Sequence, residues 1–383
     1  MSVKVIVSSE ELKKTMEFMA LISSNAFGKK KDDDLKQMAN ALHIKAVSPY
    51  QDKNYMLMFG RVGNNEQLVY RMEGKSLNNT ESAEIYVDCK KFMALSKTFT
   101  GDVGITFTDD TNILINVAGS KYVLNSISTE IPLLEVPPEG GYNLLTNFLF
   151  EAVRFCSVAI SREALGMRGA IEVNIAENGS AVCYGAQSSC LAKFVVPSTG
   201  CRHKLTLHML PLHLQHIAEL AEGGEIRLVK GKQDAVFVTA VRFEYMCYPL
   251  SGTFFEVNRA LGRCQTNKTI SVNKSRLIAA LARTAVVAGD DDNASNKVNI
   301  CSDTANIYLN ASSVAGNGVE AIPLDSVEGD AESNNYLPVG RILKIVNACH
   351  SESISISTKG EFDPLIIRPA GSESFYLVAP MRG

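Results

Sequence analysis

The stretch VKVIVSSEELKKTMEFMALI, residues 3–22, contains the pattern that decides the fold. It opens with valine at every second position from Val3 to Val7, which is typical of a β-strand with one buried face. Ser9 then predicts a helix N-cap, because two glutamates follow it in the first turn, where carboxylates are favourable. Apolar side chains next recur at helical spacing and predict one buried stripe, made of Leu12, Met16 and Met19. The stretch is therefore a short strand that leads directly into an amphipathic helix.

This strand-to-helix pattern occurs six times along the chain. The six strand openings are Val3–Val7, Glu84–Val87, Tyr142–Leu145, Lys204–Leu207, Thr269–Val272 and Asn335–Leu337. The helices that follow begin near Ser9, Cys89, Phe148, Met209, Asn273 and Pro338. Between the helices, alternating runs bounded by turn residues, such as the hairpin signal Asn178-Gly179, predict about four strands per unit. A repeat of this kind dictates architecture, and six helix-plus-four-strand units predict an α+β fold with helices on one face of antiparallel sheets.

Two linker-like segments divide the chain. Ile131–Gly141 contains prolines and glycines, and Gly262–Lys268 is polar and lacks helical or strand periodicity. We therefore predict three tandem domains of two units each, with the bounds 1–135, 136–265 and 266–383.

The composition indicates a globular protein of the cytoplasm. Of the 383 residues, 46% are hydrophobic and 21% are charged, which places the chain outside the disordered class. The N-terminus lacks the apolar core of a signal peptide, and no apolar run approaches the ~20 residues of a membrane span. Nine cysteines without a C-x-x-C pair predict reduced thiols rather than a disulfide framework.

Positive charge is concentrated on the six predicted helices, although the chain has a net charge of −3. The helical segments carry 11 Lys or Arg against 6 Asp or Glu, whereas the rest carries 27 against 35. Two helices repeat a basic–small–basic outer face: Lys90, Ala94 and Lys97 in one, and Arg276, Ala280 and Arg283 in the other. A local field of one sign favours a polyanion as partner. The residues that we predict to contact nucleic-acid phosphates are Lys13, Lys14, Lys90, Lys97, Arg154, Lys274, Arg276, Arg283, Arg341 and Lys344.

No catalytic motif is present: neither G-x-S-x-G, nor a P-loop, nor H-E-x-x-H occurs. His213 and His216 lie one helical turn apart and could share a metal ion, as a hydrolase would require, but surface histidines are the favoured interpretation. Asp290–Asp292 is interpreted as a solvated loop rather than a Mg²⁺ site. Lys29–Lys31 is interpreted as a loop for which a nucleic-acid contact stays open. The sequence thus predicts no enzyme, no cofactor and no metal.

The C-terminal run Phe375–Gly383 resembles the terminal strand of bacterial sliding clamps, the β subunit of DNA polymerase III. Other stretches of the chain resemble the same family in the same order, namely Ala152–Ile160, Arg168–Glu172, Tyr248-Pro249 with Val257–Leu261, and Leu281–Val287. The resemblance covers the whole chain and agrees with the count of six units.

This resemblance implies a non-catalytic processivity factor with three DNA-clamp domains, whose helices line a ring and whose sheets lie outside. It implies a head-to-tail homodimer that encircles duplex DNA without reading sequence and tethers the replicative polymerase for processive synthesis. Val286 and Val287 match the apolar pair at the family's dimer interface, and the facing surface would lie in residues 99–114. The alternative is a multi-domain, β-rich scaffold that does not encircle DNA, such as a structural protein of a phage particle.

The family also has a pocket that takes short peptides from the polymerase catalytic subunit, the clamp loader and other proteins with a clamp-binding motif. The residues that the resemblance assigns to this pocket are Ala186, Ser188, Ser189, Cys190, Leu191, Pro249, Ala260, Asp363, Leu377, Ala379, Met381 and Arg382. This chain departs from the family there, since Ser189 and Cys190 replace the usual His and Arg, and Ala379 replaces a Met. A short insertion precedes Arg259. The peptide preference of the pocket is therefore expected to differ.

Overall fold

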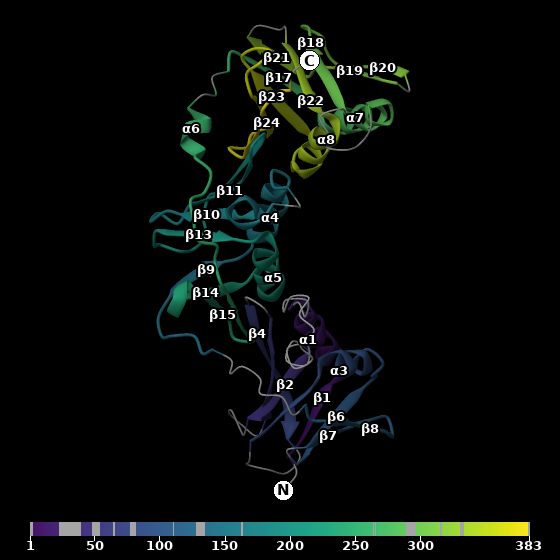
Figure 1. Cartoon of the computed structure of the whole chain (residues 1–383), viewed down its shortest axis with the longest axis vertical. Coiled ribbons are helices and arrows are strands. Elements are labelled where there is room, and N and C mark those ends of the chain that lie inside the picture. The colour runs from purple at the N-terminus through teal and green to yellow at the C-terminus, as the bar shows by residue number, and fades with distance from the viewer. Residues whose placement is uncertain are drawn as a thin grey trace. The chain divides into compact units, whose positions relative to one another are not determined.

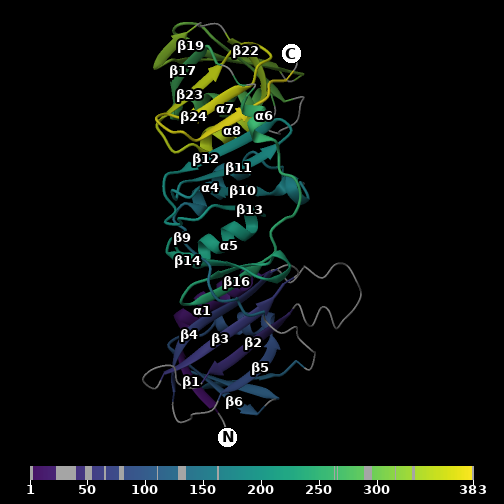
Figure 2. The ribbon, with the colours of Figure 1, turned by 90° about the vertical axis from the view of Figure 1, so that its left-hand side faces the viewer.

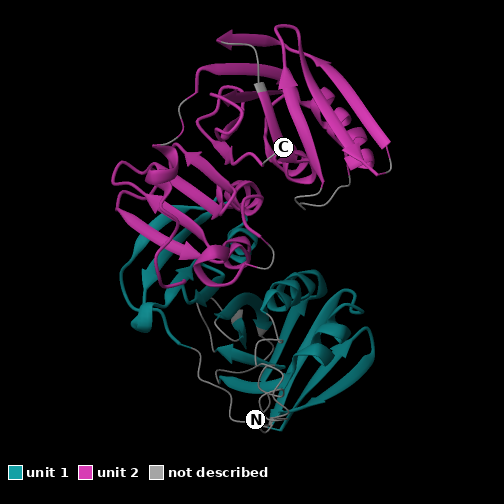
Figure 3. Ribbon diagram, turned by 45° about the horizontal axis from the view of Figure 1, so that its top comes forward, with its two compact units in different colours: residues 1–146, 216–249 teal, residues 147–215, 250–383 magenta. Residues whose placement is uncertain are grey.

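The computed structural model describes residues 3–22, 40–47, 54–63, 66–76, 82–109, 111–127, 135–161, 164–262, 264, 266–288, 296–314, 316–329 and 333–381. The chain divides into two compact units, coloured separately in Figure 3. The first contains residues 1–146 and 216–249, and the second contains residues 147–215 and 250–383. The division into three domains at 135 and 265 is not tested by these units and stays a prediction.

The first unit is built on one 12-stranded antiparallel sheet. Its main strand order is β8-β7-β6-β1-β4-β16-β15-β14-β9, and β2, β3 and β5 extend it from β4. The strands are β1 (Val3–Ser8), β2 (Ala41–Val47), β3 (Asn54–Val62), β4 (Glu66–Ser76), β5 (Ala83–Asp88), β6 (Asp102–Asp109), β7 (Asn112–Val117), β8 (Ser120–Asn125), β9 (Tyr142–Leu145), β14 (Glu225–Lys230), β15 (Val236–Thr239) and β16 (Phe243–Cys247). Figure 2 shows β4, β3, β2 and β5 as successive neighbours. The helices are α1 (Ser9–Leu21), α3 (Cys89–Ser96) and the second half of α5 (Pro211–Ala221).

The second unit contains a nine-stranded sheet and a four-stranded sheet. The larger sheet has the order β13-β10-β11-β12-β25-β24-β23-β17-β21, with β10 (Ile171–Ile175), β11 (Ala181–Gln187), β12 (Cys190–Val196), β13 (Leu205–Met209), β17 (Lys268–Asn273), β21 (Ser326–Gly329), β23 (Ser353–Thr358), β24 (Leu365–Pro369) and β25 (Phe375–Val378). The smaller sheet has the order β20-β19-β18-β22, with β18 (Lys297–Ser302), β19 (Asn306–Ser313), β20 (Gly316–Pro323) and β22 (Ser333–Pro338).

The helices of the second unit are α4, α6, α7 and α8. Their bounds are α4 (Leu149–Ser157), α6 (Val257–Leu261), α7 (Lys274–Ala288) and α8 (Val339–Ala348), and a short 3-10 turn, η2, spans Gly166–Gly169. Helices α7 and α8 pack side by side (Figure 1).

The six predicted strand-to-helix openings are confirmed. The pairs β1–α1, β5–α3, β9–α4, β13–α5, β17–α7 and β22–α8 occur in this order, and each helix begins within two residues of its predicted start. Three strands follow each of these helices before the next opening, apart from the additional α6 and β21. The α+β fold class is therefore confirmed.

Local chemistry explains why the helices begin where they do. Ser8, rather than the predicted Ser9, caps α1, because its hydroxyl accepts the Glu10 backbone N–H at 3.3 Å while Ser9 is buried in the first turn. The Asp88 carboxylate caps α3 by accepting the Lys91 N–H at 2.8 Å. Caps of this kind satisfy backbone donors that have no partner inside the helix.

The predicted apolar stripes pack against the sheets. Leu12, Met16 and Met19 of α1 are buried, as are the alternating valines of β1. On α8 the buried side chains include Val339, Ile342, Ile345 and Val346, whereas Leu343 is half-buried. Within the described residues, every helix is too short or too polar to cross a lipid bilayer.

Candidate functional site

The ten cations predicted to contact phosphate lie on, or directly beside, five of the six repeated helices. Seven of them are exposed: Lys14, Lys90, Lys97, Arg154, Arg276, Arg283 and Lys344. Lys13, Lys274 and Arg341 are half-buried. The predicted face of Lys90, Ala94 and Lys97 on α3 is exposed throughout. These side chains are therefore accessible to different degrees, and the differences follow from their contacts.

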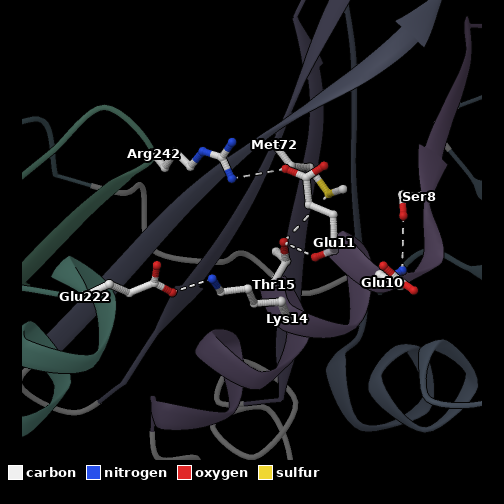
Figure 4. A network of polar contacts seen from close by, with 8 residues as sticks. All are labelled: Ser8, Glu10, Glu11, Lys14, Thr15, Met72, Glu222 and Arg242. Carbon is white, nitrogen blue, oxygen red and sulfur yellow. Dashed lines mark hydrogen bonds and ion pairs between the residues drawn. The ribbon is translucent and has the colours of Figure 1, made fainter.

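Lys14 of α1, and an arginine beside this helix, pair with acidic side chains of the same unit (Figure 4). The Lys14 ammonium forms an ion pair with Glu222, just after α5, and hydrogen bonding to this carboxylate raises the pKa of Lys14. Arg242 reaches Glu11 from outside the helix, with 3.4 Å between Nη1 and Oε1. The positive charge of this region is thus partly balanced within the protein.

Helix α7 presents two exposed arginines but not the predicted small residue between them. Arg276 and Arg283 are exposed, whereas Ala280 is only 1% exposed. The prediction for Ala280 was wrong because the buried face of α7 is wide and also takes in Leu277 and Thr284. Arg283 binds the Glu320 carboxylate of β20 at two points, both 2.7 Å long.

Three cations of the second unit donate to uncharged oxygens. Arg154 on α4 donates to the Asn347 carbonyl at 3.3 Å, and Lys274 donates to the Cys349 carbonyl. Arg341 on α8 donates through Nη1–H to the Ser189 hydroxyl. Neutral acceptors leave the positive charge unbalanced, so these three remain attractive to an anion.

The sequence predicted surface histidines on α5, but His213 and His216 are buried in the structure. His213 is 6% and His216 is 3% exposed. Nδ1 of His216 lies 3.3 Å from the Glu66 carboxylate, which also accepts the Tyr245 hydroxyl at 2.8 Å. The prediction failed for His216 because Glu66, on the distant strand β4, gives the buried imidazole a polar partner. Among the described residues no group of three or more His, Cys, Asp and Glu side chains could hold a metal ion.

The nine cysteines are free thiols. Burial raises the pKa of Cys183 and of Cys349 to about 12, so these thiols are poor nucleophiles at neutral pH. Cys190, assigned to the pocket, is 3% exposed on β12.

Several residues assigned to the partner pocket form one apolar cluster in the second unit. The cluster consists of Ala186, Leu191, Val257, Ile366 and Leu377, and Ala260 packs against it. Val257 and Ile366 were missed by the sequence analysis. We call this group the pocket cluster.

Other residues assigned to the pocket border the pocket cluster, lie in the first unit or fall outside the described residues. Cys190 pairs with Val378, and the Ala379 N–H donates to the Ser189 carbonyl at 2.9 Å, so the C-terminal segment borders the β11–β12 turn. Asp363 lies near Cys264, whose pKa is raised first by burial and then by the Asp363 charge, and Cys264 packs on the pocket cluster. Pro249 belongs to the first unit, and Arg382 lies outside the described residues, as do Lys29–Lys31 and Asp290–Asp292.

A cleft of about 590 Å³ adjoins the predicted pocket and was not anticipated. Its walls are formed by Ser161, Ala164, Met167, Arg168, Ala186, Gln187, Ser188, Thr253, Phe254 and Phe255. Phe254 also packs against the pocket cluster and stacks on His208, with ring centroids 5.6 Å apart. His208 in turn lies 2.8 Å from the Glu172 carboxylate. The paired phenylalanines in the insertion before Arg259 were the signal that could have revealed this cleft.

The strands that end their sheets include β8 in the first unit and β20 in the second, each without a described neighbour on one side. Both edges carry an exposed valine, Val123 at 59% and Val319 at 70% exposure. Val286 on α7 is 85% exposed, and Val287 packs against Gly318 of β20, where a Cβ atom would come within 3.3 Å of a valine methyl. The predicted facing surface, residues 99–114, includes Phe99, which is only 2% exposed.

The fold is that of known structures along the whole chain. A DNA polymerase III beta chain from Streptococcus pneumoniae matches with a TM-score of 0.83 at 13% identity, and 100% of each chain is covered. The beta subunit from the DNA polymerase of Streptococcus pyogenes matches with a TM-score of 0.86 at 12% identity, over 99% of this chain and 100% of that one. A DNA polymerase sliding clamp from Bacillus subtilis matches with a TM-score of 0.81 at 17% identity, over 100% of both.

By contrast, no protein-family model and no curated protein sequence matches the chain. The likeness is thus one of structure, and at 12–17% identity it shows the fold alone. The resemblance inferred from the C-terminal run is confirmed at that level. The chain has the fold of the bacterial sliding clamps, the beta subunits of DNA polymerase III.

Proposed function

We propose that this protein is a sliding clamp, a non-catalytic processivity factor that encircles duplex DNA and tethers a DNA polymerase. The observation that carries the proposal is the full-length fold match, in which 100% of this chain and 100% of a known clamp superimpose. Because a fold alone can host many functions, the proposal also needs support from the residues. We place the protein in the cytoplasm, where replication proteins of this kind work.

DNA contact would come from the repeated helices. Their exposed lysines and arginines are suited to phosphate oxygens, and such contacts read no sequence, as a sliding sleeve requires. Acidic partners, such as Glu222 for Lys14 and Glu320 for Arg283, would keep these contacts weak. A ring that is held by its topology tolerates weak contacts, because dissociation then requires opening.

Ring closure would use one open strand edge of each unit. We propose a head-to-tail homodimer in which β8 of one subunit pairs with β20 of the next, with Val286 and Val287 beside the contact. An exposed strand edge is a ready template for pairing with another chain. A contact between two different surfaces closes into a ring when the rotation between subunits permits it.

The pocket cluster and the adjoining cleft would bind short peptides of the polymerase catalytic subunit, the clamp loader and other partners. The cleft is mostly apolar and has the size of a peptide or ligand site. Peptide capture raises the effective concentration of the polymerase at the primer end.

The experiment compares retention on circular and linear DNA. Purified protein is loaded onto a nicked circular duplex by a clamp loader, and half of the sample is then cut once. Retention on the circle and rapid loss from the linear duplex are expected, because a sleeve slides off a free end. Equal retention on both would contradict encirclement and would favour the scaffold alternative.

A further inference from the structure

A row of aromatic and basic side chains crosses four neighbouring strands of the nine-stranded sheet, β11, β12, β25 and β24. Tyr184 of β11 pairs with Lys193 of β12, and Lys193 pairs with Phe375 of β25. Arg368 of β24 follows, with 5.8 Å between its guanidinium carbon and the centroid of the Phe375 ring. Aromatic and basic residues therefore alternate along this line, which we call the aromatic–basic row.

The row lies on the face of the sheet that points away from α4. Neighbouring residues of a strand project to opposite faces. Tyr376, next to Phe375, stacks on Phe155 of α4 with ring centroids 4.1 Å apart. Phe194, next to Lys193, lies against the same ring at 5.5 Å. Phe375 and Lys193 consequently project from the opposite face, so the sheet lies between the row and α4.

The two cations of the row have no acidic partner among the described residues. The Lys193 ammonium lies 5.5 Å from the centroid of the Phe375 ring, and the Arg368 guanidinium lies near the same ring. Nε of Arg368 has no hydrogen-bond partner within the described part of the chain. Both side chains are half-buried, so water screens them less than it screens exposed cations. Their positive charge is thus left for an anion from outside.

Next to Arg368, the same face carries hydroxyl groups. Ser355 of β23 pairs with Arg368, and Ser271 of β17 pairs with Ser355. The Ser271 hydroxyl also forms a hydrogen bond with the Ser353 hydroxyl at 2.9 Å. Hydroxyl groups hydrogen-bond to phosphate and sugar oxygens without adding charge. The polar track therefore continues beyond the two cations.

The carboxylates of this face lie at its borders. Glu172 on β10 is two strands from Lys193 and forms hydrogen bonds with two neighbouring side chains. Glu328 is on β21, three strands from β24. Asp325 accepts the Ser353 hydroxyl at 3.3 Å, and Glu373, exposed in the turn before β25, forms no ion pair with a described cation. The centre of the face is therefore the part that attracts negative charge.

The alternation of rings and cations indicates which kind of anion fits. Surfaces that bind single-stranded nucleic acid combine a positive track with aromatic side chains, because an unpaired strand offers both phosphates and base rings. A duplex keeps its bases stacked inside, and an acidic peptide would use the cations without the rings. A single strand is thus the anion that uses both features of the row.

We infer that the aromatic–basic row is a binding site for single-stranded nucleic acid. Lys193 and Arg368 contact phosphates, while Phe375 and Tyr184 offer ring surface to bases. The two aromatic residues border the pocket cluster, whose Leu191 and Leu377 lie two residues from Lys193 and Phe375 on the same strands. The inference goes beyond the proposed function, since it gives the protein a second nucleic-acid site that holds an unpaired strand outside the sleeve.

The test uses a small, covalently closed circle of single-stranded oligothymidylate, without a clamp loader. Such a circle cannot thread through a closed ring, so its binding reports a site on another surface. Anisotropy of the fluorescein-labelled circle measures binding to the full-length protein at several salt concentrations. The slope of log affinity against log salt should become shallower by about 0.7 in Lys193→Gln and in Arg368→Gln, the value of one phosphate contact with a single strand. Arg202→Gln, which removes an exposed arginine of the same unit, should leave the slope unchanged.

A third variant tests the aromatic part of the row. Phe375→Leu keeps an apolar side chain beside the pocket cluster and removes the ring, so the circle should bind roughly tenfold more weakly. This variant retains both cations and therefore also covers the case in which a charge variant does not fold. If all three variants bind the circle like wild type, the inference is wrong.

The other outcomes separate the row from the sleeve and from a protein ligand. Absence of circle binding by wild type overturns the inference and leaves the sleeve standing, because loading on nicked circular duplex tests the sleeve independently. Loaded Lys193→Gln and Arg368→Gln should remain on that duplex like wild type, and their loss would mean that these residues act on the ring instead. Oligoglutamate that displaces the oligothymidylate circle at equal charge would identify an acidic protein segment as the ligand and overturn the nucleic-acid assignment.

Discussion

Arg283 of α7 and Glu320 of β20 form a two-point ion pair, with 2.7 Å between Nε and Oε1 and 2.7 Å between Nη2 and Oε2. The Arg283 hydrogen bonds lower the pKa of the Glu320 carboxyl. Both groups are near the surface, where such pairs contribute little stability. The main consequence concerns binding, because Glu320 occupies the Nε and Nη2 donors of Arg283 and balances the charge that would attract a phosphate.

Removing the Glu320 charge should therefore strengthen DNA binding. In Glu320→Gln, Arg283 no longer has a charged partner and gains access to phosphate. The slope of log affinity against log salt should become steeper by about 0.9, the value of one phosphate contact. Titration of a short labelled duplex at several salt concentrations measures this slope. Glu328→Gln, an exposed carboxylate on β21, is the matched control and should leave the slope unchanged.

Reversing the charges of α3 should weaken DNA binding. Lys90 and Lys97 are exposed on one face and form no ion pair with a described carboxylate. In the Lys90→Glu, Lys97→Glu double variant the salt slope should become shallower by ~1.8, the value of two phosphate contacts. Lys91→Glu lies on another face of the same helix and should have a smaller effect. An equal effect of Lys91→Glu would mean that net charge matters, and not the predicted face.

The subunit contact can be tested through its exposed valines. Val123→Asp on β8 and Val319→Asp on β20 each place a charge on a proposed interface, and either should convert the dimer into a monomer. Light scattering after size-exclusion chromatography gives the mass directly. Val241→Asp changes a valine that is 92% exposed elsewhere, and it should remain dimeric. Dimeric Val319→Asp protein would rule out β20 as the contact.

Phe254 is expected to be an anchor of the partner pocket. It lines the cleft, packs on the pocket cluster and stacks on His208. Phe254→Ala should weaken binding of an apolar peptide by roughly tenfold, as truncation of an aromatic anchor does. Anisotropy of a labelled peptide measures the change. Val314→Ala, at a fully exposed position, should bind normally.

Stability of the first unit should fall at mildly acid pH because of His43. Burial lowers the pKa of His43 below its ordinary value of 6.5, although the neighbouring Glu84 opposes the shift, and the ring stacks on Tyr86 at 4.5 Å. Since the unfolded chain binds the proton more readily, the free energy of unfolding decreases as the pH falls through 6.5 toward the folded-state pKa.

His43→Phe keeps an aromatic ring beside Tyr86 but cannot be protonated. Urea unfolding at a neutral and a mildly acid pH should show a smaller loss of stability in this variant than in wild type. An unchanged loss would place the pH dependence on another group.

The architecture was predictable because its signals are local. Alternating valines, helical stripes and turn residues lie within a few positions of one another, so the sequence located all six strand-to-helix openings. Charge partners were not predictable in the same way. Glu320 lies 37 residues from Arg283, and Glu66 lies 150 residues from His216. Whether a cation is available, or a histidine is buried, depends on such distant partners and needs the folded structure.

The pocket was predicted in part for a related reason. Its strand residues, such as Leu191 and Leu377, stand in runs whose order resembles a known family, and the structure brings them together. The cleft depends on the insertion that carries Phe254 and Phe255, for which the resemblance offers no counterpart.

The cluster of Glu66, His216 and Tyr245 has a consequence for how the protein can be dissected. β4 pairs directly with β16, and the Tyr245 hydroxyl and the His216 imidazole reach Glu66 from segments more than 140 residues further along the chain. A truncated polypeptide that stops at residue 146 would lack His216 and Tyr245, together with β16, the strand that pairs with β4. The backbone of β4 that pairs with β16 would then be an unpaired strand edge, so such a fragment should tend to aggregate. The compact unit that contains the N-terminus is consequently discontinuous in sequence, and producing it in isolation would require joining residues 216–249 to residues 1–146.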